Sequence, residues 1–255
     1  LTQIKTANPT AKVTVVGGPG SVPAAQITQL TSVFGAGNVE RLLSTGSRYD
    51  MAAAVSARMR AARGADMRDA VFFANGADSS TFFDALALSA ASRSRGIPIL
   101  LVAKDTVPPA TTAEVAALSS QAGSHGVSLI RILGGGPGTV SEAVRVQLGV
   151  VPGGRWYGAD RYSTSTTIAR NCINNFFSSA GYVAVAAMMP DALSGGASIG
   201  RREGVLVVTA PTSLPSATGT FLHDTRASMG ECYIFGGTGS VSTGVESAMK
   251  TKLAP

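Results

Sequence analysis

The chain has 255 residues, of which 45% are hydrophobic and 14% are charged, so an intrinsically disordered protein and a coiled coil are both excluded. Its longest apolar runs, such as residues 183–189, are much shorter than the roughly 20 residues that a membrane-spanning helix needs. The net charge is +6, from 16 Arg and 5 Lys against 15 acidic residues. An Arg-rich surface suits an anionic polymer, although a GC-rich coding sequence explains the same Arg excess. Nucleic acid is not favoured as a partner, because aromatic and basic residues do not interleave.

Strands and helices are predicted to alternate along the chain. In chain order, short apolar runs predict strands at 13–16, 70–73, 98–102, 130–133, 181–187, 205–209 and 232–235. Helices are predicted between them, at 23–30, 51–63, 82–95, 111–122, 141–148 and 163–177. Fully apolar strands separated by helices indicate parallel sheets that are covered on both faces. The predicted fold class is therefore α/β, built from small doubly wound modules.

A strand that runs into a glycine turn occurs three times, and this internal repeat decides the predicted architecture. The turns hold the pairs Gly17-Gly18, Gly135-Gly136 and Gly236-Gly237. We interpret them as structural corners, each followed by a Ser or Thr that caps the next helix. Contact with a polymer phosphate or carboxylate is the alternative. A nucleotide site is disfavoured, since the turns do not fit G-x-G-x-x-G and no Walker lysine exists.

Other landmarks recur in the same order and define the predicted repeats. They are Arg48-Tyr49 with Arg161-Tyr162, Asp84-Ala-Leu with Asp191-Ala-Leu, and the strand that starts at Pro98 with its counterpart at 205–209. We predict the C-terminal part of a first repeat at 1–38, a second repeat at 39–150 and a third at 151–255. Since a lone strand and helix cannot bury their apolar faces, an upstream segment, a cleaved piece or another subunit is expected to supply the rest of the first repeat.

These residues resemble the type 2 cell-wall-binding repeat of Gram-positive surface proteins. The second copy shows Arg41, Arg48-Tyr49, Asp84-Ala-Leu, Pro98, Gly135-Gly136 and Val140-Ser141. The third copy shows Arg155, Gly158, Asp160-Arg161-Tyr162, Asp191-Ala-Leu, Gly236-Gly237 and Val241-Ser242. The resemblance covers nearly the whole chain.

The resemblance implies Rossmann- or Toprim-like modules that come in threes, with pseudo-threefold symmetry in the full protein. It further implies an extracellular, non-catalytic anchor that binds anionic wall polymers of the teichoic-acid type. Such repeats are fused to a separate effector domain. A self-assembling surface-layer repeat and an α/β enzyme acting on a sugar or nucleotide are the alternatives that the sequence leaves open.

The candidate polymer-binding residues are arginines and the tyrosines beside them. They are Arg41, Arg48, Tyr49, Arg155, Arg161 and Tyr162. A guanidinium group binds phosphate and carboxylate through paired hydrogen bonds. Arg48 and Arg161 stand near predicted helix starts, where the helix dipole disfavours a cation, so a specific partner is expected for each. That partner is either the polymer or the recurrent Asp84 and Asp191.

No catalytic site, metal site or cofactor is predicted. Asp84 and Asp191 are expected to cap helices or to pair with arginine. A glycosidase needs two carboxyl groups at one site, whereas each repeat offers one. The sequence contains no G-x-S-x-G, H-E-x-x-H or C-x-x-C motif.

Two cysteines, Cys172 and Cys232, allow a single disulfide within the third repeat. A bridge would stabilise the fold by about 4 kcal/mol and would imply an oxidising compartment. Two buried free thiols are the equally favoured alternative.

Overall fold

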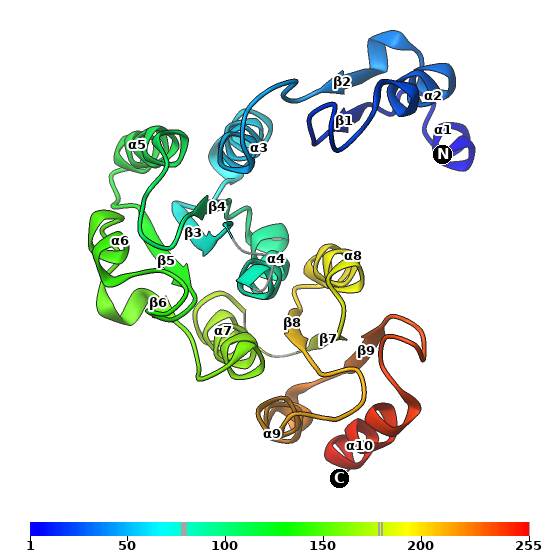
Figure 1. Cartoon of the computed structure of the whole chain (residues 1–255), viewed down its shortest axis with the longest axis vertical. Coiled ribbons are helices and arrows are strands. Elements are labelled where there is room, and N and C mark those ends of the chain that lie inside the picture. Colours follow the sequence, from blue (N-terminus) through cyan, green and yellow to red (C-terminus); the bar gives the residue numbers. More distant parts are fainter. Residues whose placement is uncertain (78–80, 178, 180, 255) are drawn as a thin grey trace.

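A computed structural model describes residues 1–77, 81–177, 179 and 181–254, and its helices and strands follow one another along an open arc (Figure 1). The strands are β1 (Val13–Val15), β2 (Val39–Arg41), β3 (Ala70–Asn75), β4 (Ile99–Val102), β5 (Ile130–Gly134), β6 (Arg155–Trp156), β7 (Tyr182–Ala186), β8 (Val205–Val208) and β9 (Glu231–Phe235). The α-helices are α1 (Thr2–Ala7), α2 (Ala24–Phe34), α3 (Arg48–Arg63), α4 (Phe82–Arg95), α5 (Pro109–Ser124), α6 (Glu142–Gln147), α7 (Arg161–Phe176), α8 (Met189–Gly200), α9 (Ser216–Thr225) and α10 (Thr243–Leu253). Within these residues, no helix has the length and apolarity needed to cross a membrane.

The strands form three sheets, in the orders β1-β2, β4-β3-β5-β6 and β8-β7-β9. Every strand pair is parallel, and helices connect the strands. The predicted α/β class with parallel sheets is thus confirmed. The helix predicted at 51–63 begins earlier, at Arg48, because Ser47 and Asp50 form a capping box there.

The first strand of each later repeat pairs with the sheet that precedes it. β2 lies beside β1, with Arg41 opposite Val15, and β6 lies beside β5, with Arg155 opposite Leu133. Each of these arginines therefore faces the residue two positions before the first glycine of a turn. The sheets do not end where the predicted repeats 39–150 and 151–255 begin, and the repeat boundaries stay a prediction.

The second and third copies are joined through a shared apolar core. One buried cluster runs from Phe72 on β3 through Ile168 on α7 to Val183 on β7. Helices α4 and α8 also lie against each other (Figure 1). Their close approach depends on glycine, because a Cβ at Gly196 of α8 would collide with the Ser89 side chain of α4.

Both cysteines are free thiols, so the disulfide alternative is wrong. Cys172 on α7 is part of the buried core, and Cys232 on β9 packs against the same cluster. Burial raises the pKa of the Cys172 thiol to about 12 and that of Cys232 to about 11. Both groups therefore remain protonated and behave as small apolar side chains at neutral pH.

Candidate functional site

Arg41 and Arg155 bind the glycine turns of the neighbouring strands. The Nη2 atom of Arg41 donates to the carbonyl oxygen of Val22 at 2.6 Å, and its Nη1 atom donates to that of Gly17. The Nη2 atom of Arg155 donates to the carbonyl oxygen of Val140 at 2.7 Å and to that of Ser141 at 3.2 Å. Two predicted polymer-binding arginines are thus turned toward backbone carbonyl groups at equivalent places.

The side chain of Arg155 is deeply buried. It is 4% exposed, and its Nη1 atom lies 3.7 Å from a carboxylate oxygen of Glu142. Burial lowers the pKa of Arg155, and the nearby Glu142 carboxylate acts in the opposite direction. A guanidinium group in this position stabilises the turn and offers little surface to a ligand.

The first glycine of each turn has a backbone conformation that other residues rarely adopt. The φ angles are +142° at Gly17, +108° at Gly135 and +113° at Gly236. A carboxylate also occupies the space where a side chain would be. A Cβ at Gly135 would lie 2.6 Å from Oδ2 of Asp84, and one at Gly236 would lie 2.5 Å from Oδ2 of Asp191. Asp-Ala-Leu and Gly-Gly therefore recur together because the Asp carboxylate of each pair packs against the first glycine of the turn.

Asp84 and Asp191 are each the third residue of a helix, and among the described residues neither side chain accepts a capping hydrogen bond. That they cap their helices stays a prediction. Among the described residues, neither forms an ion pair with Arg48 or Arg161, because both carboxylates lie over the glycine turns instead. Capping by serine is confirmed after two of the turns, where Ser141 and Ser242 cap α6 and α10.

Asp84 is a buried acidic residue. Desolvation raises its pKa from 3.8 to about 6. Between about pH 4 and pH 6 the folded state therefore binds more protons than the unfolded state, and the free energy of unfolding falls as the pH rises. Below pH 4 the carboxyl group is neutral in both states and this destabilisation is absent.

We expect Asp84→Asn to remove this pH dependence. The rise of the pKa corresponds to roughly 2–3 kcal/mol, so the variant should be more stable than the parent at pH 7 by about that amount. Urea denaturation at pH 4 and pH 7 measures the difference. Asp105→Asn, which changes an exposed carboxylate, is the control. Parallel pH profiles for Asp84→Asn and the parent would contradict the expectation.

Arg48 and Arg161, predicted to be equivalent, have partly different surroundings. The Nη1 atom of Arg48 donates to the carbonyl oxygen of Gly76, just after β3, at 2.6 Å. Arg161 is exposed and lies across two aromatic rings, with its guanidinium carbon 4.9 Å from the ring centres of both Phe83 and Tyr162. Its Nη2 atom donates to the Tyr162 hydroxyl group at 2.7 Å. Arg48 is exposed as well, and its guanidinium carbon lies 5.8 Å from the ring centre of Phe82. Both arginines thus lie over a phenylalanine at the start of α4, and Arg48 differs by its hydrogen bond to the end of β3.

Arg161 lies at the rim of a hollow of about 300 Å³ at the carboxyl ends of β5 and β6. The hollow is lined by Asp84, the turn from Gly136 to Thr139, the loop from Tyr157 to Arg161, and Thr164. We refer to it as the carboxyl-end hollow. Tyr49 lies outside it, at the start of α3 and half-buried.

The loop before α7 holds Arg161 in place. Asp160 accepts the N–H group of Ser163 at 2.7 Å and caps the helix, and these hydrogen bonds lower the pKa of Asp160. The N–H group of Gly158 donates to the Thr164 hydroxyl oxygen at 3.0 Å. The run from Gly158 to Thr164 is therefore one fixed unit.

From the sequence, Tyr157 and Thr164 had no predicted role, and Asp160 was named only as part of the Asp160-Arg161-Tyr162 motif. Asp160, followed three residues later by Ser163, fits a helix-capping pattern. Tyr157 gave no signal, because its place over Gly136 depends on the pairing of β6 with β5. The residue is 45% exposed, and its ring forms one wall of the hollow.

Chemically, the carboxyl-end hollow combines a cation, hydrogen-bond acceptors and an exposed aromatic ring. Among the described residues, Arg161 uses its Nη2 atom in a hydrogen bond to Tyr162, which leaves its other N–H groups to bind phosphate or carboxylate oxygens. No group of three or more His, Cys, Asp or Glu side chains that would suit a metal is found in the described part of the chain.

Comparison with known proteins identifies the family. The family model for cell wall binding domain 2 (CWB2) matches residues 43–145 and 155–246. The chain belongs to the CWB2 family. The resemblance predicted from the sequence is thus confirmed. The turns at Gly135 and Gly236, the Asp-Ala-Leu segments and Arg161 lie within the two matched segments, whereas the turn at Gly17 lies outside them.

Solved structures agree with this assignment at the level of the fold. The CWB2 chain is similar to Cwp6 from Clostridium difficile, with a TM-score of 0.78 and 22% identity over 99% of this chain and 38% of that one. It is also similar to Cwp8 from Clostridium difficile, with a TM-score of 0.72 and 18% identity over 96% of this chain and 39% of that one. The chain thus spans less than half the length of either protein. A comparison with curated proteins found no match.

Proposed function

We propose that this chain is a non-catalytic anchor that holds a larger surface protein on the outside of a bacterial cell wall by binding an anionic polymer of the teichoic-acid type. Membership of the CWB2 family supports binding to the wall. The observation that carries the finer part of the proposal is the exposed guanidinium group of Arg161 at the rim of the carboxyl-end hollow.

Arg161 is suited to an anionic group for two reasons. It is the first residue of α7, where the positive end of the helix dipole reinforces its charge. The two aromatic rings beneath it hold the guanidinium plane in one orientation, which lowers the entropy that binding must remove. The exposed ring of Tyr157 lies where a sugar ring of the polymer would pack.

The charge of the whole chain supports the same ligand. A net charge of +6 favours association with a polyanion, and contacts at several repeats would combine into stable attachment. Because these contacts are electrostatic and exposed, we expect retention on walls to weaken as the salt concentration rises.

Arg161→Ala is expected to weaken binding to purified walls about tenfold, since one charged hydrogen-bonding group is worth about 1.5 kcal/mol. Binding is measured by co-sedimentation of the native protein with walls over a range of wall concentrations. The matched control is Arg201→Ala, which removes another exposed arginine of the third repeat, at the far end of α8. Equal binding by Arg161→Ala and the parent would reject Arg161 as a contact.

A further inference from the structure

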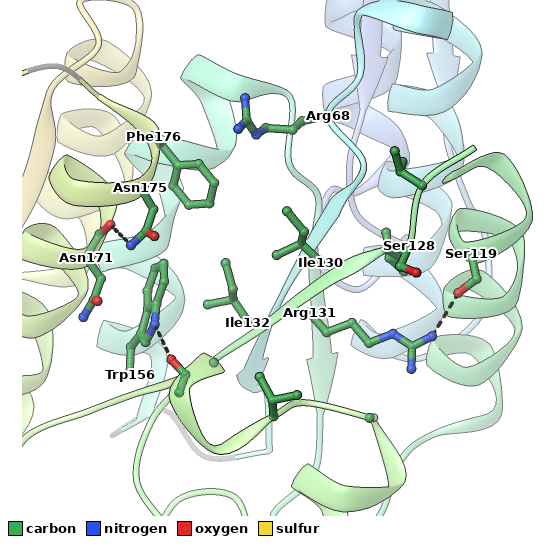
Figure 2. A pocket seen from close by; sticks show the side chains of 16 residues that line it. Arg68, Ser119, Ser128, Ile130, Arg131, Ile132, Trp156, Asn171, Asn175 and Phe176 are labelled. Atoms are coloured by element: carbon green, nitrogen blue, oxygen red, sulfur yellow. Dashed lines mark hydrogen bonds between the residues drawn. The ribbon is translucent and has the colours of Figure 1, made fainter. Parts of the chain in front are cut away.

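A groove of about 810 Å³ opens at the amino-terminal ends of β3, β5 and β6. Arg161 lies at the opposite, carboxyl-terminal ends of the strands. We call this groove the amino-end groove. Figure 2 shows Ile130, Ile132, Trp156 and Phe176 turned toward this space from two strands and a helix. The volume is large enough for a small saccharide.

Two amide side chains on α7 offer hydrogen-bond acceptors to the groove. The Nδ2 atom of Asn171 donates to the carbonyl oxygen of Thr167 at 2.9 Å, and that of Asn175 donates to the carbonyl oxygen of Asn171 at 2.7 Å. These bonds fix the orientation of both amides. Neither Oδ1 atom has a partner among the described residues, and both side chains line the groove. Each is free to accept a hydroxyl group.

The charge of the groove is positive. Arg68 is exposed, and its guanidinium carbon lies 5.4 Å from the centre of the Phe176 ring. Within the described part of the chain its guanidinium group forms neither an ion pair nor a hydrogen bond. Arg131, the other cation of the lining, is bound to the carbonyl oxygen of Leu148 at 3.0 Å and to the Ser119 hydroxyl group at 3.1 Å. No carboxylate lines the groove as the structure describes it.

The side chains of the lining decide which ligand the groove suits. β6 pairs with β5 only at Leu133 and Gly134, so the residues of β5 at the groove are paired with β3 alone and the strand edge does not select the ligand. Apolar and aromatic walls, fixed amide oxygens and a guanidinium group match a polyhydroxylated ring with a negative substituent.

We propose that the amino-end groove binds a sugar unit of an anionic saccharide, with Asn171 and Asn175 accepting its hydroxyl groups and Arg68 binding its charged substituent. The proposal rests on the proposed function in one respect: the saccharide is a segment of the same wall polymer. The chain then contacts the polymer at both ends of the strands of the sheet β4-β3-β5-β6, which increases its avidity for the polymer.

Trp156 makes the proposal directly measurable, because it is the only tryptophan of the chain and it lines the groove. The probe is the set of oligosaccharides released by mild acid from purified walls of the bacterium that encodes the chain. Titration into the native protein is expected to change Trp156 fluorescence saturably. Asn175→Ala combined with Arg68→Gln should raise the apparent Kd at least about fivefold, through loss of two polar contacts.

Two control variants separate this groove from the carboxyl-end hollow. Asn174→Ala changes an exposed neighbour of Asn175 that does not line the groove, and should leave the titration unchanged. Arg161→Ala should weaken retention on walls and leave the fluorescence titration with short oligosaccharides unchanged.

Either of two results overturns the groove proposal while the anchor function stands: unchanged Trp156 fluorescence in a protein that walls still retain, or equal affinity of the parent and the double variant. If the parent protein showed neither a fluorescence response nor retention on walls, the groove proposal and the proposed function would both be rejected.

Discussion

Gly135→Ala is expected to lower the free energy of unfolding by about 3–5 kcal/mol. A φ angle of +108° strains any residue with a side chain by about 1–3 kcal/mol. The added Cβ would also stand 2.6 Å from Oδ2 of Asp84, a carboxylate that is itself mostly buried and has little room to move. Urea denaturation followed by circular dichroism measures the loss.

The same turn supplies the control. Gly138→Ala places a methyl group in open space, so its effect should stay within about 0.5 kcal/mol. In an Asp84→Ala background the collision disappears, and Gly135→Ala should then retain only the backbone strain. If Gly135→Ala and Gly138→Ala were equally stable, the pairing of the Asp-Ala-Leu segment with the glycine turn would have no structural meaning.

Arg155→Ala is expected to destabilise the fold by about 2–4 kcal/mol. The change removes the charged donor of two carbonyl groups, at Val140 and Ser141, and leaves a cavity beneath a side chain that is 4% exposed. Its Nε and Nη1 atoms make no hydrogen bond to described residues, which reduces the net contribution of the guanidinium group. Thermal and urea unfolding measure the difference.

Comparison with Arg161→Ala tests the division of roles between the two arginines. Arg161 is exposed, so its replacement should change stability by less than about 1 kcal/mol and should act on wall binding. Arg155→Ala should lower the free energy of unfolding and leave wall binding unchanged at temperatures where the variant remains folded. An Arg155→Ala variant with full stability and no wall binding would show that Arg155 contacts the polymer.

The strands and the repeats were predictable because their signals are local. Fully apolar runs such as 70–73 and 205–208 mark buried parallel strands without knowledge of their neighbours. The glycine turns were predicted because they recur three times along the chain. The capping serines after two of them were predicted because each stands directly before a helix. Composition and periodicity were sufficient for these elements.

The roles of the arginines were not predictable, because they depend on contacts across a repeat boundary. Arg155 is the first residue of the second CWB2 segment, but its strand completes the sheet formed by β3, β4 and β5, which brings it to the turn after β5. Arg48 and Arg161 look alike in the motif, and both lie over a phenylalanine of α4. Arg48 also donates to the carbonyl oxygen of Gly76, a contact that the motif does not indicate.

The position of Asp84 illustrates the same limit. An acidic residue near a helix start predicts a cap, whereas the carboxylate lies over Gly135, which is distant in sequence. The amino-end groove also combines separate segments, with Arg68 before β3, Ile130 on β5 and Asn175 on α7. No local pattern signals such an assembly.

Attachment of this chain to the wall through an anionic polymer is the proposed function. Co-sedimentation of the native protein with purified walls, before and after chemical removal of their anionic polymers, tests it most directly. We predict binding to intact walls that weakens with rising salt and is lost on stripped walls. Undiminished, salt-insensitive binding to stripped walls would contradict the proposed function and would identify peptidoglycan as the ligand.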